Sequence, residues 1–319
     1  MQQQAKAAAR RGQVTAIHSI DRFAISVPEL DAARRYFSAF GLDVREIPGG
    51  LALHTFGAEH CWATVHETGR RKRLEYLSFG AWPEDLEALA ARARGMGVAI
   101  EAPHPMSDGQ GVWMRDPDGI AVQLVAAEKV TPSAAAQMAP PDARVNAVGA
   151  AIAPSRSQGG PVRPQRLSHV LLFSTDVPRS LRFYSDVLGL RLSDRSQDLI
   201  AFTHGAHSSD HHLLALVKSD APGMHHSSWI VHNVDEIGRG MEQMMAAGFT
   251  EGWGVGRHVI GSNYFYYARD PWGSFAEFSC GIDYIDAATE WPAGDYPPED
   301  SFYLWGPSVP ENFTVNHEA

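Results

Sequence analysis

The amino-acid sequence predicts an α+β protein with two tandem domains, each built from two βαβββ modules that curl into a half-open barrel. Three observations support this prediction. The chain has 319 residues, which is about twice the usual size of one domain. Residues 130–165 are rich in Ala, Pro, Ser and Gly and have no periodic pattern, as is typical of a linker. The sequences on either side of this linker repeat the same order of elements.

The first strand and helix are predicted by matching runs in the two halves. Residues 23–44, FAISVPELDAARRYFSAFGLDV, give a short strand followed by a helix that carries Tyr36 and ends at a glycine. Residues 171–192, LLFSTDVPRSLRFYSDVLGLRL, repeat this plan and place Tyr184 equivalently. The repeat therefore begins with a βα unit in each half.

The second module of each half follows the same logic. Residues 82–98 and 233–249 are amphipathic and close on a glycine, which predicts a helix in each half. Residues 112–125 and 266–279 each hold R-D-P-x-G between alternating apolar runs, which predicts two strands joined by a turn.

These elements divide the chain into five predicted segments. The beginning of the chain is basic but lacks the continuous apolar core of a signal peptide, so we expect it to be disordered. The end of the chain holds aromatic residues among prolines. Such aromatic residues are seldom left exposed to solvent, so we expect this segment to cover the second barrel or a neighbouring subunit. The segments are a leader (1–15), a structural domain without metal (16–129), a linker (130–165), a catalytic domain (166–285) and a C-terminal arm (286–319).

Composition excludes several classes of protein. The chain has 27 Lys and Arg against 37 Asp and Glu, a formal net charge of −10, and no long basic run, which argues against nucleic acid as a partner. No stretch approaches the roughly 18 apolar residues of a membrane-spanning helix. Two distant cysteines can build neither a disulfide framework nor a cysteine zinc site, so a reducing cytoplasm is expected.

Histidines point to a metal site in the second half, because ten of the 15 lie after residue 165. An iron(II) site for oxygen chemistry uses two neutral imidazoles and one carboxylate on a single face. His169, His226 and Glu277 lie on predicted strands and supply this set. The repeat places Asp21, Glu75 or Tyr76, and Gln123 at the corresponding positions of the first half, which therefore lacks a complete triad.

The second half, residues 166–286, resembles the type I extradiol ring-cleavage dioxygenases of the vicinal oxygen chelate superfamily, whose two-domain subunits keep the metal in the C-terminal domain. The resemblance implies that His169, His226 and Glu277 bind Fe(II), with Mn(II) as an alternative, and that O2 is a co-substrate. It also implies a small aromatic diol as substrate and a homo-oligomer.

The second ligand position has a competitor, His225, since neighbouring residues of a strand face opposite ways and only one of them would reach the metal. The family ligand precedes an acidic pair, which is Asp235 and Glu236 in this chain. We therefore prefer His226.

Two further motifs carry the resemblance. GVGRHVIGSNYFYYARDP, residues 254–271, holds His258 and Tyr267, which by resemblance would hydrogen-bond the diol and relay its proton. DHHLLAL, residues 210–216, places His212 where the family has an acid/base histidine beside the dioxygen position.

Four aromatic residues are candidates for the walls of the substrate pocket. Relatives that act on catechols with a carboxylate side chain have an arginine at the position of Trp253, which favours an apolar or bicyclic catechol here. Phe265 shares a strand face with Tyr267. The complete set is Trp229, Trp253, Phe265 and Trp272.

The predicted function is extradiol cleavage of a catechol to a ring-opened 2-hydroxy semialdehyde or dienoate, in the degradation of aromatic compounds. Two alternatives stay open. A glyoxalase-like isomerase or ketoacid dioxygenase of the same superfamily would use the triad without needing His212 and Tyr267 together. A ligand-sequestering protein of the resistance type would need no metal triad.

Overall fold

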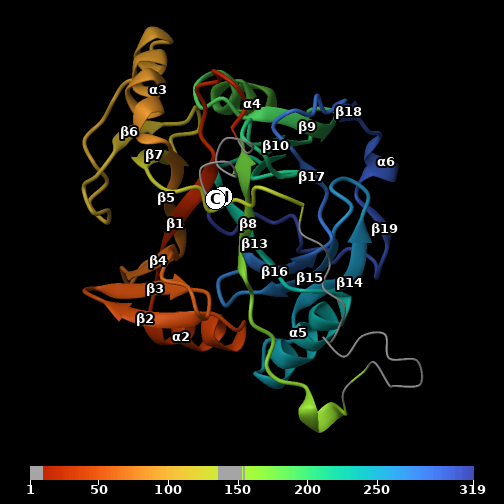
Figure 1. The fold of residues 1–319 in the computed structure, drawn as a ribbon. Coiled ribbons are helices and arrows are strands. Elements are labelled where there is room, and N and C mark those ends of the chain that lie inside the picture. The colour runs from red at the N-terminus through yellow and green to blue at the C-terminus, as the bar shows by residue number, and fades with distance from the viewer. Residues whose placement is uncertain (1–9, 136–152, 154) are drawn as a thin grey trace.

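Two large β-sheets dominate the computed structural model, which describes residues 10–135, 153 and 155–319. The first sheet has seven strands in the order β2-β3-β4-β1-β5-β7-β6. The second has ten, in the order β18-β9-β10-β12-β8-β13-β16-β15-β14-β19. Figure 1 shows the first sheet, red to yellow, beside the second, green to blue.

The first domain consists of two modules joined through the antiparallel pair β1 and β5. Its second module is reduced, because the strand expected directly after the helix survives only as a bridge between Glu101 and Trp113. The elements are β1 (Ser19–Val27), α2 (Leu30–Ala39), β2 (Asp43–Ile47), β3 (Gly50–His54), β4 (Cys61–Glu67), β5 (Arg73–Ala81), α3 (Pro83–Gly95), β6 (Val112–Arg115) and β7 (Ala121–Ala126).

The second domain repeats this arrangement with complete modules, joined through the antiparallel pair β8 and β13. The first module holds β8 (Arg166–Ser174), α4 (Val177–Asp186), β9 (Arg191–Ser196), β10 (Ile200–His204) and β12 (Leu214–Lys218). The second holds β13 (Gly223–Ile230), α5 (Val234–Ala246), β14 (Gly252–His258), β15 (Tyr264–Arg269) and β16 (Phe275–Cys280).

Shorter elements complete the second domain. β18 and β19 come from the predicted C-terminal arm and pair with the outer strands β9 and β14, so the arm extends the sheet at both edges. The remaining elements are η1 (Arg156–Gln158), β11 (Ser209–Asp210), β17 (Tyr284–Ile285), β18 (Gly294–Asp295), α6 (Pro298–Ser301) and β19 (Tyr303–Trp305).

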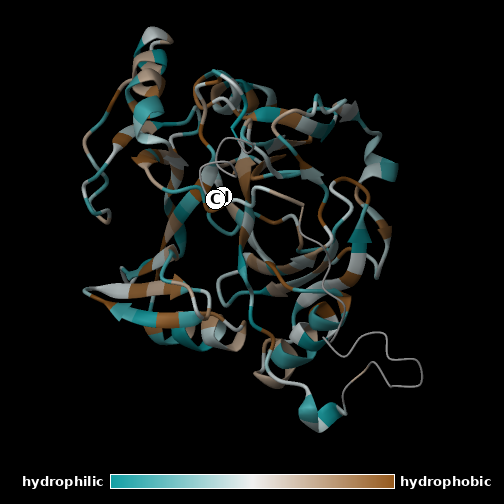
Figure 2. Cartoon of the chain, in the orientation of Figure 1, coloured by the Kyte–Doolittle hydropathy of each residue, from teal (hydrophilic) through white to brown (hydrophobic). Residues whose placement is uncertain are grey.

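Each module closes on a parallel pair of strands, which a helical crossover makes possible. These pairs are β1 with β4, β5 with β7, β8 with β12 and β13 with β16. The predicted α+β class and the βαβββ plan are therefore confirmed. Helix starts in the second domain follow ordinary capping chemistry, since Asp176 and Asn233 accept from the backbone N–H groups of Arg179 and Glu236. Figure 2 shows hydrophilic segments on α3 and α5 and many hydrophobic ones on the strands.

The two domains share one hydrophobic core, to which matching tyrosines of the repeat contribute. Tyr36 Oη of α2 donates to the Ala268 carbonyl of the second domain at 2.7 Å. Tyr184 Oη of α4 donates to Asp116 Oδ2 of the first domain at 2.9 Å. A buried phenol needs such a partner, so these contacts hold the domains together reciprocally.

The predicted leader and linker are described only in part. Residues 1–9, 136–152 and 154 lie outside the described residues. Of the remaining leader, Arg10 forms ion pairs with Glu84 and Asp85 at the start of α3, so this part is held against the first domain rather than disordered. Within the described ranges, no helix is long and apolar enough to cross a membrane.

Candidate metal centre and substrate cavity

Strand register in the second domain aligns chemically active residues in one row. Ser228 of β13 pairs with His169 of β8 and with Glu277 of β16. Glu277 in turn pairs with Tyr267 of β15, and Tyr267 pairs with Trp253 of β14. Residues that are paired in this way share a face of the sheet. The row therefore runs across five strands.

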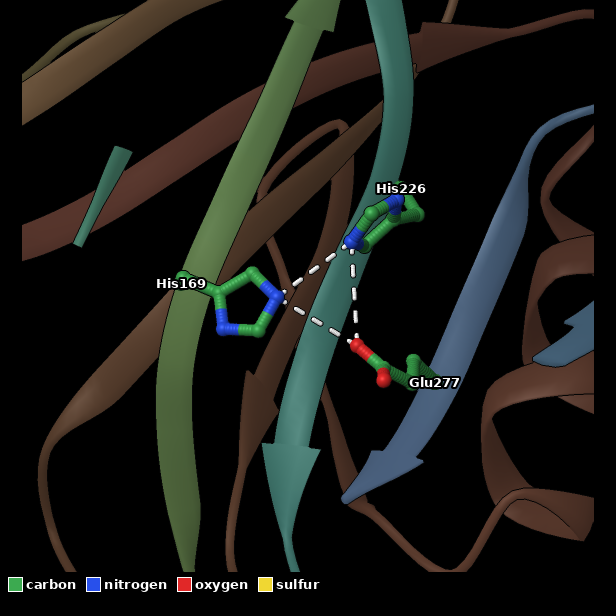
Figure 3. Close-up of side chains that lie close together, drawn as sticks. All are labelled: His169, His226 and Glu277. Atoms are coloured by element: carbon green, nitrogen blue, oxygen red, sulfur yellow. Dashed lines mark hydrogen bonds and ion pairs between the residues drawn. The ribbon is translucent and has the colours of Figure 1, made fainter. Parts of the chain in front are cut away.

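His226 joins this row from two positions before Ser228 on the same strand. Figure 3 shows His169, His226 and Glu277 directed at one another from β8, β13 and β16. The two Nε2 atoms lie 3.3 Å apart, and Glu277 Oε2 lies 3.3 Å from His169 Nε2 and 3.7 Å from His226 Nε2. One ion could contact all three side chains, because their ligand atoms lie within 4.8 Å of one another.

The carboxylate of Glu277 has one oxygen that is available to a cation. Its side chain is fully buried, and Oε2 has no hydrogen-bond partner in the described part of the chain. Oε1 accepts from Asn263 Nδ2 at 3.0 Å, which fixes the orientation of the group. A buried charge without a partner is costly, whereas a metal ion would compensate it. The residues present thus fit a metal.

Burial keeps the nearby imidazoles neutral. It lowers the pKa of His226 and of His212 well below the usual value, and neighbouring histidines lower it further. The pKa of His258 is lowered by the same desolvation, which Glu277 partly opposes. Burial raises the pKa of Tyr267 well above 10, so its phenol is protonated. Neutral imidazoles offer the lone pairs that metal binding and proton acceptance require.

His212 lies beside the triad, with its ring centroid 4.0 Å from that of His169. Its Nδ1 contacts His211 Nδ1 at 3.0 Å, and His211 Nε2 contacts Asp194 Oδ2 at 2.7 Å. Since the carboxylate accepts, His211 donates from Nε2, and in the tautomer with a single ring proton its Nδ1 accepts. Nδ1 of His212 then carries the proton, and its Nε2 is free to accept one.

His258 and Tyr267 form a second hydrogen-bonded pair. The Phe302 carbonyl lies 2.8 Å from His258 Nδ1 and can only accept, so that nitrogen donates. His258 Nε2 then accepts from Tyr267 Oη at 2.9 Å. The oxygen of Tyr267 keeps lone pairs for another donor.

These groups open onto a cavity of about 260 Å³. Besides the four site histidines and His225, its walls are mostly aliphatic or aromatic, and no Lys or Arg is among them. The apolar lining residues are Leu171, Leu199, Ile200, Phe202, Val217, Ile260, Pro298, Phe302 and Phe313.

Comparison with known proteins identifies the family. The model of the Glyoxalase/Bleomycin resistance protein/Dioxygenase superfamily matches residues 19–124 and 166–278. The chain belongs to this superfamily. The resemblance inferred from the second half is therefore confirmed, and it extends to the first half.

Within the superfamily, the chain is 51% identical over 304 residues to metapyrocatechase 2 of Cupriavidus necator, covering 95% of this chain and 93% of that relative. It is 33% identical over 130 residues to an iron-dependent extradiol dioxygenase of Rhodococcus jostii, covering 36% and 43%.

Solved structures of the superfamily share the fold at lower identity. The Mn(II)-bound glyoxalase from Novosphingobium aromaticivorans has a TM-score of 0.76 and 23% identity, covering 95% of this chain and 96% of that one. Homoprotocatechuate 2,3-dioxygenase from Arthrobacter globiformis has a TM-score of 0.74 and 20% identity, covering 96% and 94%.

The predicted pocket walls need correction. Trp229 is fully buried in the common core, and Trp272 packs at its margin in the turn after β15, so neither lines the cavity. Trp253 and Phe265 pack behind the site, where Phe265 stacks on His258 at 4.1 Å and Trp253 on Tyr267 at 5.6 Å. They support the catalytic candidates rather than forming the walls.

Sequence reasoning also missed residues that contribute to the site. Asn263 lies inside the motif that gave His258 and Tyr267, and its single amide was the available signal. The walls from β10 carry an alternating apolar pattern that is not specific to a pocket. Phe302 and Phe313 belong to the arm, whose aromatic content, Phe313 included, indicated packing over this barrel but did not place either residue at the cavity.

The counterpart row in the first domain shows where one alignment was wrong. Ser78 of β5 pairs with Arg22 and Gln123, so Arg22, not Asp21, corresponds to His169. The sequence alignment matched the two helix tyrosines, Tyr36 and Tyr184. These are one residue further apart in the chain than the equivalent strand positions, Arg22 and His169. The same register assigns Tyr76, rather than Glu75, to the position of His226.

A larger cleft of about 610 Å³ is lined mainly by residues of the first domain. It contains none of the predicted site residues and mixes basic and acidic side chains, among them Arg70, Arg73 and Glu75. Because it lacks a converging set of ligand atoms, we assign the site to the smaller apolar cavity.

Proposed function

We propose that this protein is an extradiol ring-cleaving dioxygenase, which inserts both atoms of O2 into a catecholic substrate and gives a ring-opened 2-hydroxy semialdehyde or dienoate. The identity of 51% with metapyrocatechase 2 over nearly the whole of both chains carries the proposal. The convergence of two imidazoles and a carboxylate on one face supports it independently.

His169, His226 and Glu277 would hold the metal. A bound ion would supply positive charge that favours ionised diol oxygens. Fe(II) is the proposed ion, and Mn(II) is the alternative. The triad consists of nitrogen and oxygen ligands that suit both ions, so metal analysis of the purified protein decides between them.

Two groups of the chain handle protons. Tyr267 Oη can accept a hydrogen bond from a diol hydroxyl while its own proton is donated to His258 Nε2. A concerted shift along this pair takes one proton from the substrate. His212, with its free Nε2 beside the triad, is placed to accept a second proton and to return it to the opened product.

The cavity supports a catechol with an uncharged, apolar substituent. A carboxylate side chain would be buried against aliphatic walls without a cationic partner among the lining residues. We expect kcat/KM for 3-methylcatechol or 2,3-dihydroxybiphenyl to exceed that for 3,4-dihydroxyphenylacetate by about 100-fold or more. A preference for the acid would contradict this assignment.

The decisive experiment is anaerobic reconstitution with Fe(II), followed by a catechol and then air. A yellow ring-fission product that appears only with O2 supports the proposal. Isomerisation of a glutathione hemithioacetal without O2 uptake would instead favour the glyoxalase-like alternative. Catechol binding without turnover would favour a sequestering protein. A homo-oligomer and a cytoplasmic location are further proposals, for size-exclusion chromatography and cell fractionation to test.

A further inference from the structure

His225 and His226, adjacent in β13, have imidazole rings in direct contact. Their Nδ1 atoms lie 2.7 Å apart, and the ring planes are inclined at 77°. Neighbouring side chains of a regular strand point to opposite faces, so this contact requires an irregularity. The register of β13 against β8 shifts between Met224 and His226, which places a bulge at His225. Bulges re-aim side chains, and both histidines line the cavity.

The partner of His225 on its other side fixes its proton. Nε2 lies 2.7 Å from the Phe313 carbonyl oxygen, which can only accept, so Nε2 donates. The ring is 4% exposed and lies among Phe173, Phe275 and Phe313, with centroids 5.3, 5.4 and 4.8 Å away. Such surroundings disfavour a charged imidazolium. Nδ1 of His225 therefore has no proton and accepts.

The position of the proton on His226 follows from which ring nitrogens donate and which accept. Its Nδ1 must donate to His225, because the opposite tautomer would set two lone pairs against each other at 2.7 Å. Its Nε2 is then unprotonated and faces His169 Nε2 and Glu277 Oε2. Only a ring nitrogen with a free lone pair can bind a metal.

We propose that His225 is a positioning residue. The Phe313 carbonyl keeps the proton of His225 on Nε2, so His225 Nδ1 accepts a hydrogen bond from His226 Nδ1, and His226 Nε2 stays free for the metal. The inference rests on the metal site of the proposed function. Phe313 is itself anchored, since its ring packs on Trp253, Tyr267 and Phe275. The C-terminal segment thereby reaches a metal ligand through two hydrogen bonds.

The first test measures Mn(II) binding to the metal-free full chain, with the free ion followed by electron paramagnetic resonance. His225→Phe keeps an aromatic ring in the aromatic surroundings but removes both hydrogen bonds. We expect it to weaken Mn(II) binding by about 10–100-fold, as for other groups that orient metal ligands. His225→Gln can accept from His226 and donate to Phe313, so it is expected to restore most of the affinity. His54→Phe, a buried histidine of the first domain, is the matched control and leaves affinity unchanged.

Equal Mn(II) affinity of the unaltered chain and the His225→Phe variant would overturn the role of His225 and leave the proposed function standing. Equal weakening by Phe and Gln would overturn it too, since ring shape and not hydrogen bonding would then matter. Failure of the unaltered chain to bind Mn(II) or Fe(II) would instead contradict the proposed metal site.

The second test needs no metal and no activity. Long-range ¹H–¹⁵N spectra of metal-free protein labelled at histidine report which ring nitrogen carries the proton. The inference expects His226 protonated at Nδ1 in the unaltered chain and in His225→Gln. It expects a mixture or the Nε2 form in His225→Phe. A His226 that is protonated at Nε2 in the unaltered chain would overturn the proposal even if every variant folds poorly.

Discussion

The row of residues across the first sheet holds Arg22, Ser78, Gln123 and Trp113, whereas the matching row of the second sheet holds His169, Ser228, Glu277 and Tyr267. The backbone arrangement is the same. In the first row, the guanidinium, the amide and the indole have protein partners: Arg22 donates to Asp21, and Gln123 and Trp113 both donate to the Gln110 carbonyl. The serine hydroxyls, Ser78 and Ser228, lack a partner within the described residues in both rows and so do not distinguish them.

The second row is left electrostatically incomplete. Among the residues that the structure describes, no hydrogen-bond donor reaches the buried Glu277 Oε2, and two imidazole nitrogens face it. The comparison teaches that one fold can serve as support or as a metal site, depending on whether its buried polar groups find protein partners. The following predictions test that difference, from the largest expected effect to the smallest.

Glu277→Gln gives the second row the amide that the first row has. The variant should lose metal binding and fall below the detection limit of ring cleavage, because a neutral amide does not compensate a divalent cation. The metal-free variant should stay folded, since Gln123 is accommodated at the same position of the first sheet. Calorimetric Mn(II) titration and circular dichroism check both statements. Retained Mn(II) binding would show that this carboxylate is not a ligand.

His212→Phe separates catalysis from metal binding. The ring touches His169 but is not one of the three converging ligands, so Mn(II) affinity should change by less than about tenfold. Turnover should fall by about 10²–10⁴-fold, the usual contribution of an acid/base group. Loss of bound metal in this variant would make His212 a ligand.

Acid should destabilise the second domain through its buried histidines. Burial, with help from His211 and Arg191, lowers the pKa of His204 from its usual 6.5 to about 4. Between these two pH values the unfolded chain binds a proton that the folded chain does not, so stability falls as pH falls through this window.

In the His204→Leu variant, the free energy of unfolding of the metal-free protein, measured in urea, should therefore fall less steeply as the pH is lowered. The slope should decrease by up to about 1.4 kcal/mol per pH unit. His54→Leu in the first domain should reduce this pH dependence less, because burial and the Arg45 charge lower the pKa of His54 by a smaller amount, and Asp43 opposes them. Equal slopes for both variants would argue against this difference between the domains.

Gln123→Leu tests the first row, where we expect only a structural cost. The Gln110 carbonyl loses one of its two donors but keeps Trp113, so the free energy of unfolding should fall by about 0.5–1.5 kcal/mol. Metal content and turnover should stay within twofold of the unaltered chain, as the site lies in the other domain. A marked loss of metal would mean that the domains are coupled through their common core.

The repeat, the fold class and the identity of the converging triad were accessible from sequence. Strand alternation and a glycine-closed helix are local signals, and a repeat tests each of them twice. The assignment of His169, His226 and Glu277 needed only residue type and strand face, and the three side chains do meet. The roles of these residues stay predictions.

Other features depended on backbone irregularities and on distant segments. The bulge at His225 brings both histidines of β13 to the cavity, whereas a regular strand would expose only one of them there. No pattern in the sequence predicts such a bulge. The aromatic residues near the motif were expected to line the pocket, yet Trp229 belongs to the core, and Phe302 and Phe313 arrive from the arm. Their places depend on tertiary contacts.

The reciprocal tyrosines have a consequence for protein engineering. Tyr36 anchors on the backbone of β15 and β16, the two strands that carry Tyr267 and Glu277. A chimera that takes its amino-terminal half from a relative would have to keep this hydroxyl in place, or β15 and β16 would lose a buried hydrogen-bond partner. The first half, which contributes none of the three converging side chains, therefore helps to fix the shape of the second half, and recombination libraries should keep the two halves together.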